Sequence, residues 1–95
     1  MIQRFEYSTE AFWKFLKAYL LTEHNLSANS PREVIRTGLK TKLYSEEISK
    51  ELLQMQDDRN LTSHTYVEEL AETIAGRIPA YSKNMHAVLN QLSNT

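Results

Sequence analysis

Cysteine is absent from this 95-residue chain, and glycine and proline occur only twice each. Without cysteine the chain can form neither a disulfide nor a thiolate metal site. The scarcity of backbone breakers, beside many leucine, glutamate, lysine and alanine residues, favours helices over strands. No apolar run approaches the roughly 20 residues that a membrane span needs. The start, MIQRFEYSTE, is charged early and does not resemble a signal peptide. We therefore expect a cytoplasmic protein with no membrane attachment.

The sequence also lacks a strong charge of either sign. Eleven basic residues stand against twelve acidic ones, which gives a formal net charge of −1. The protein as a whole therefore does not attract nucleic acid, and any contact with RNA or a nucleotide must rest on a local patch. The length suits one domain, residues 1–95, with a modest core that partner chains would help to stabilise.

Hydrophobic periodicity predicts a first helix from about Ile2 to Glu23. Its apolar residues cover more than one narrow stripe, so we expect two buried sides. A second helix should open at Ser30, which can cap it, because Pro31 suits the first helical position and Glu33 can close a capping box.

A third helix should open at Ser45, a capping residue followed by two glutamates that suit the N-terminal dipole. A fourth should run from about Val67 toward Leu92, with a kink at Pro79. Four amphipathic helices with short loops predict an all-α fold, an antiparallel up-and-down four-helix bundle.

The third helix carries an apolar seam of Ile48, Leu52 and Met55, and the next position of that seam is Arg59. A charged residue therefore falls where the pattern predicts core or interface. Arginine is rarely buried unless it is paired or used. Arg59 is thus a candidate functional residue.

Four residues separate Arg59 from His64, so on one regular helix the two would lie about 140° apart. Asn60 and His64, spaced by four, would share a face. Two arrangements bring Arg59 and His64 together: the helix ends near Asn60, or a second copy of the chain completes a composite site. Histidine can move a proton near neutral pH, and arginine can stabilise a phosphoryl oxygen, so the pair could cleave RNA without metal. Taken alone, however, such a pattern is more often structural.

Three blocks carry a resemblance to a known family: IQRFEYSTEAFWKFLKAYL, SPREVIRTGLK and DDRNLTSHTY, in that order. Together they resemble the HEPN superfamily, in the branch of nucleotidyltransferase substrate-binding subunits that includes the HepT toxins. Arg59, His64 and Tyr66 match the family motif Arg-x4-His-x-Tyr, and Asn60 matches the polar residue common after the arginine. The resemblance implies a helical bundle that forms a homodimer with two such motifs across one cleft. Family members usually carry a further helix ahead of the first block, and we expect this chain to lack it.

The resemblance also implies a function. Toxin members are metal-independent ribonucleases, and a minimal nucleotidyltransferase antitoxin silences them by transferring AMP to the motif tyrosine, here Tyr66. An alternative is a non-catalytic subunit that binds the nucleotidyltransferase and presents a substrate. A third alternative is a degenerate structural bundle. None of these requires a cofactor.

Other candidates are weaker. Arg32, Arg36 and Lys40 recur every fourth residue and could contact phosphate or RNA, although a solvated face is commoner. Glu6 and Glu10 share one face of the first helix, as surface carboxylates often do. No histidine has a ligand-spaced partner, so we expect no metal site.

Overall fold

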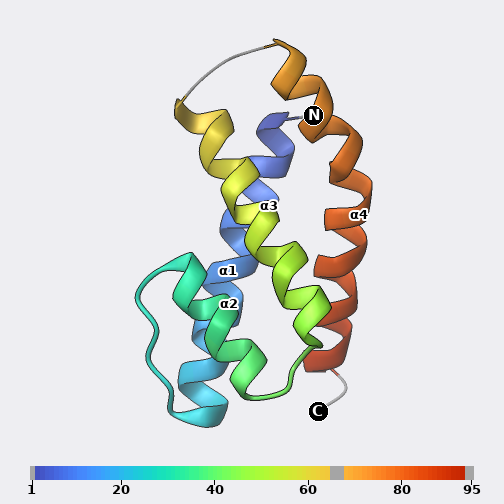
Figure 1. The fold of residues 1–95 in the computed structure, drawn as a ribbon. Helices are drawn as coiled ribbons and strands as arrows, with labels where there is room; N and C mark the ends of the chain where they lie inside the picture. The colour runs from blue at the N-terminus through green and yellow to red at the C-terminus, as the bar shows by residue number, and fades with distance from the viewer. Residues whose placement is uncertain (1, 65–67, 94–95) are drawn as a thin grey trace.

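The computed structural model describes residues 2–64 and 68–93, and all regular structure in them is helical (Figure 1). The helices are α1 (Ile2–His24), α2 (Pro31–Lys40), α3 (Glu46–His64) and α4 (Glu68–Ser93). The predicted all-α fold with four helices is confirmed, and the expected ends of the first and last helices lie within one residue of those observed. Within the described residues, no helix has both the length and the apolar character that crossing a membrane requires.

The central pair of the bundle is α1 with α3. Each of these two contacts all the other helices, whereas α2 and α4 make no contact with each other among the described residues. α3 runs antiparallel to all three neighbours (Figure 1). α1 and α2, by contrast, run in the same direction, because the connection between them returns along α1 before α2 begins. The predicted up-and-down order therefore holds from α2 to α4 but not between α1 and α2. Ala28 in this connection is buried.

The predicted serine caps are confirmed at both helix starts, whereas Glu33 accepts from the amide of Asn29 instead of that of the cap residue Ser30. Ser30 Oγ accepts a hydrogen bond from the Glu33 amide at 3.2 Å, and the Glu33 carboxylate accepts one from the Asn29 amide at 3.1 Å. Ser45 Oγ likewise accepts from the Ile48 amide at 3.2 Å. The two serine caps satisfy backbone donors that the first helical turn leaves without partners.

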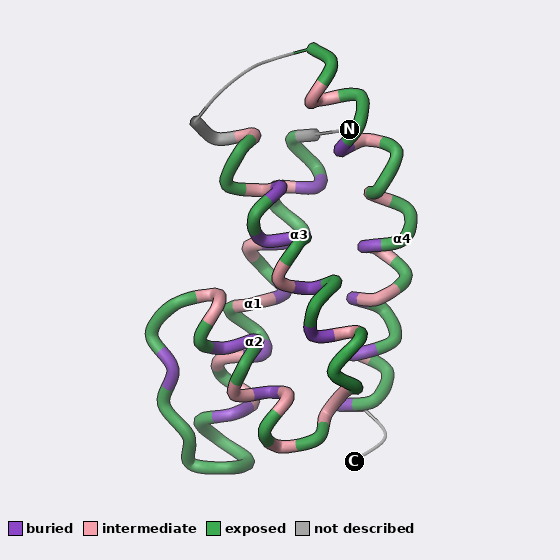
Figure 2. Tube along the Cα trace, viewed as in Figure 1, coloured by how far each residue is buried: buried purple, intermediate pink, exposed green. Residues whose placement is uncertain are grey.

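The core takes buried residues from all four helices, and those of α2 pack on the α1 and α3 side of the bundle (Figure 2). The prediction that α1 is buried on two sides was only partly right. Phe12 and Leu16 are buried, but Phe15 and Tyr7 are 54% and 67% exposed. α1 therefore keeps exposed apolar side chains, and Phe15 lines a groove between α1 and α4 together with Met85 and Leu89. α4 continues as one helix through Pro79.

Candidate functional site

The predicted chemical segment occupies the last turns of α3. The helix runs without a break to His64, so the alternative in which it ends near Asn60 is wrong. Arg59 and His64 thus stand on one helix, about 140° apart around its axis. The side chain of His64 and the whole of Tyr66 lie outside the described residues.

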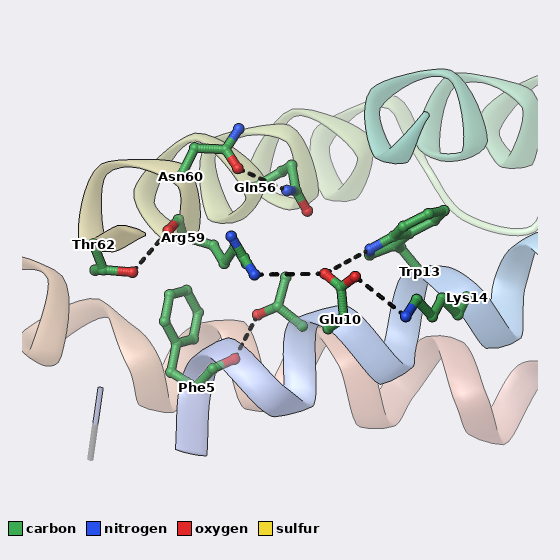
Figure 3. A network of polar contacts seen from close by, with 9 residues as sticks. Phe5, Glu10, Trp13, Lys14, Gln56, Arg59, Asn60 and Thr62 are labelled. Atoms are coloured by element: carbon green, nitrogen blue, oxygen red, sulfur yellow. Dashed lines mark hydrogen bonds and ion pairs between the residues drawn. The ribbon is translucent and has the colours of Figure 1, made fainter. Parts of the chain in front are cut away.

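Polar side chains in this segment bond within the helix instead of breaking it. Thr62 Oγ1 donates to the Arg59 carbonyl at 2.7 Å, and Asn60 Oδ1 accepts from Gln56 Nε2 at 3.2 Å (Figure 3). A hydroxyl that bonds to a carbonyl three residues earlier is compatible with helical backbone. The turn-forming residues at 60–63 consequently leave α3 intact.

Arg59 is partly buried between α3 and α1, with a side chain 25% exposed. One turn earlier, Met55 is 1% exposed, so the seam leads from the core directly to this guanidinium. Arg59 Nη2 lies 3.7 Å from Glu10 Oε2 of α1, as an ion pair (Figure 3). The arginine on the seam is therefore paired, as a half-buried charge needs to be.

Glu10, which the sequence pattern places among surface carboxylates, is the centre of this network. The Trp13 indole N–H donates to Glu10 Oε2 at 3.1 Å, and Lys14 Nζ lies 3.4 Å from Oε1. The hydrogen bond from Trp13, followed by the contacts with Lys14 and Arg59, lowers the pKa of Glu10, and partial burial opposes this change. Glu10 is therefore ionised at neutral pH and faces Arg59 as an anion.

Asp58, which sequence reasoning missed, lies next to Arg59 but points toward α4. It is 1% exposed, and its carboxylate accepts hydrogen bonds from Tyr81, from Arg77 and from Gln54. Arg77 Nη1 lies 3.2 and 3.1 Å from the two carboxylate oxygens. One signal could have found it: a tyrosine on the apolar seam of the fourth helix, which needs a polar partner for its hydroxyl.

The predicted basic stripe does not gather around Arg59. Arg32 forms an ion pair with Asp57, two residues before Arg59 on α3. Arg36 and Lys40 are exposed. The C-terminal end of α3, which carries Arg59 and His64, is called here its motif end. Because α2 runs antiparallel to α3, Arg36 and then Lys40 lie progressively further from this motif end. Only Arg32 reaches that end, and there it is already paired.

No group of three or more histidine or acidic residues that could hold a metal ion occurs in the part of the chain that the structure describes. The charged groups near Arg59 instead form the chain of contacts that links α1 to α3 and, through Asp58, α3 to α4.

Comparison with known proteins identifies the class. Over residues 1–94 the chain matches the family described as nucleotidyltransferase substrate binding protein like, and it belongs to that family. A protein from Thermus thermophilus, known from a crystal structure, has the same fold with a TM-score of 0.93 and 48% sequence identity. The match covers 96% of this chain and 76% of the Thermus chain. No curated protein matches the chain.

The neighbouring aspartates 57 and 58 give a matched test of the link between α3 and α4. We expect Asp58→Ala to lower the free energy of unfolding by roughly 2–4 kcal/mol, because the buried hydroxyl of Tyr81 loses its charged acceptor and the contact with Arg77 is lost. Asp57→Ala removes an exposed ion pair and should cost less than about 1 kcal/mol. Urea unfolding of both variants measures the difference. Equal losses would contradict the structural role given to Asp58.

Proposed function

We propose that this protein is the HEPN-type partner of a minimal nucleotidyltransferase, and that it cleaves RNA without a metal ion, as HepT toxins do. The observation that carries this proposal is the placement of Arg59: a guanidinium held half-buried at the motif end of α3, on the helix that also bears His64. Membership of the nucleotidyltransferase substrate-binding family supports the choice of partner.

The two side chains divide the chemistry between them. In RNA cleavage the 2′-oxygen attacks phosphorus, the bond from phosphorus to the 5′-oxygen breaks, and a 2′,3′-cyclic phosphate remains. His64 takes the proton from the 2′-hydroxyl or gives one to the leaving 5′-oxygen. Arg59 stabilises the charge that builds up on the phosphate oxygens in the transition state.

The helical geometry favours a site shared by two copies of the chain. Because α3 continues through both residues, the positions of Arg59 and His64 in one copy are about 140° apart around the helix axis. A homodimer that brings two α3 ends together across one cleft would set Arg59 of one protomer beside the histidine of the other.

Control of such a nuclease would act at Tyr66. In this proposal the nucleotidyltransferase transfers AMP from a nucleoside triphosphate to the Tyr66 hydroxyl, with release of pyrophosphate. The new phosphodiester carries a negative charge into the neighbourhood of Arg59 and competes with RNA for the guanidinium. The adenosine group would also obstruct the cleft.

A second candidate is a non-catalytic subunit that binds the nucleotidyltransferase and presents its substrate. The family description, which names substrate binding, favours it. So does the ion pair between Arg59 and Glu10, since a paired guanidinium can serve as a structural contact. This candidate predicts a stable complex with the nucleotidyltransferase and no cleavage of RNA by the purified protein.

His64→Ala tests the nuclease directly. We expect the variant to lose at least about 100-fold in RNA cleavage, measured on purified protein with a chelator present, because proton transfer is worth that much. Its helical content by circular dichroism should be unchanged. His86→Ala, which removes an exposed histidine of α4, is the control and should cleave normally. Full cleavage by His64→Ala would refute the role of His64 and with it the proposed mechanism, and a wild-type protein that binds the partner without cleaving RNA would establish the second candidate.

Tyr66→Phe tests the control step. When the chain is co-expressed with its proposed nucleotidyltransferase partner, we expect the wild type to gain the mass of one AMP group by intact-mass spectrometry. Tyr66→Phe should gain none and should remain an active nuclease, because the phenylalanine ring leaves Arg59 and His64 in place. AMP found on the Tyr66→Phe variant would show that another residue is the acceptor.

A further inference from the structure

Glu10 is the residue of α1 that faces the motif arginine of α3 (Figure 3). The two side chains are partly shielded from water, with 37% of Glu10 and 25% of Arg59 exposed. Their contact joins Glu10 Oε2 to a terminal nitrogen of the guanidinium at 3.7 Å, too long for a direct hydrogen bond. Glu10 therefore attracts the guanidinium without engaging it as a bidentate carboxylate would.

The Glu10 carboxylate has a fixed orientation of its own. Trp13, one turn further along α1, is packed against the core and donates its indole N–H to the oxygen that faces Arg59. The indole N–H is only a donor, so Glu10 Oε2 keeps its negative charge and a further lone pair. This oxygen faces Arg59 in the space between α1 and α3. Lys14 holds the other oxygen, but its side chain is 62% exposed and contributes less.

The fixed carboxylate of Glu10 limits the conformations that the Arg59 side chain can adopt. An arginine has several rotatable bonds, and its freedom must be lost before the guanidinium can meet a phosphate in one geometry. If Glu10 restricts that freedom beforehand, less reorganisation remains at the moment of reaction. The same negative charge repels the phosphate of the substrate, so any gain in turnover comes from the positioning of Arg59, and binding is opposed.

We infer that Glu10 is a positioning residue for Arg59: its carboxylate, anchored by the Trp13 indole, holds the guanidinium between α1 and α3 in the orientation that meets the phosphate. The inference rests on the role that the proposed function gives to Arg59. It assigns to α1 a part in the site that the Arg-x4-His-x-Tyr motif does not include.

Glu10→Gln tests this inference, because it removes the charge and keeps the size of the side chain. Glu6→Gln is the matched control: the same change one turn earlier on α1, at a residue with no ion pair among the described residues. We expect Glu10→Gln to lower kcat for RNA cleavage about tenfold, as a misplaced catalytic group does, with KM unchanged or lower. Glu6→Gln should change neither constant.

A second measurement follows the guanidinium itself. In ¹⁵N-labelled protein, the Nε–H signal of Arg59 can be assigned by its loss in Arg59→Lys. We expect Glu10→Gln to shift and broaden this signal, and Glu6→Gln to leave it in place. Trp13→Phe, which removes the indole N–H but keeps an aromatic ring, should have a smaller effect of the same kind and replaces Glu10→Gln if that variant does not fold.

The two readouts separate failure of this inference from failure of the proposed function. If the wild type cleaves RNA but Glu10→Gln keeps both kcat and the Arg59 signal, Glu10 is not a positioning residue and the nuclease stands. If the wild type does not cleave RNA, the proposed nuclease fails, and the Arg59 signal alone decides whether Glu10 positions the guanidinium.

Discussion

The buried carboxylate of Asp58 fixes the rotation of α3 about its own axis, and that rotation decides where Arg59 points. Neighbouring residues on a helix differ by about 100° in direction. Asp58 points to α4, where it accepts hydrogen bonds from Tyr81 and Arg77, and Arg59 therefore points toward α1 and Glu10. Both contacts form only when α3 sits between α1 and α4 in this one orientation.

At the motif end of α3, the contacts of Asp58 and Arg59 with the neighbouring helices are polar and directional, where the rest of the helix packs through apolar side chains. Further down the same helix, Leu52 and Met55 are buried among other apolar residues, and their packing would tolerate a small rotation. Charged groups tolerate it less, because each loses a partner when it turns away. A bundle of 95 residues has little stability to spare. The polar contacts lie where orientation matters most, beside the residues proposed to meet the phosphate.

Local signals made much of the fold predictable. Ser30 and Ser45 marked helix starts, and the helical spacing of apolar residues gave the four elements. Arg59 could be singled out because it follows Ile48, Leu52 and Met55 on one seam. The end of α3 was less clear, since residues 60–63 also suit a turn; the structure has them helical, with Thr62 bonded to the Arg59 carbonyl.

The partners of the charged residues could not be predicted in the same way. Asp58 meets Arg77 and Tyr81, which stand 19 and 23 residues away, and only the packing of α3 on α4 brings them together. Glu10 looks like a surface carboxylate four residues after Glu6, and its role appears only when α3 lies beside α1. Phe15 was expected to be buried and is exposed. Apolar character alone did not reveal which side of α1 the other helices cover.

The most direct test of a site shared between two protomers is complementation between Arg59→Ala and His64→Ala chains. Each variant alone lacks one of the two groups. When the chains are mixed and allowed to exchange, a heterodimer holds one intact Arg59 and one intact His64, on different copies. We predict that RNA cleavage returns on mixing. Heterodimers that form, as native mass spectrometry would show, but remain as inactive as the parent variants would contradict a shared site.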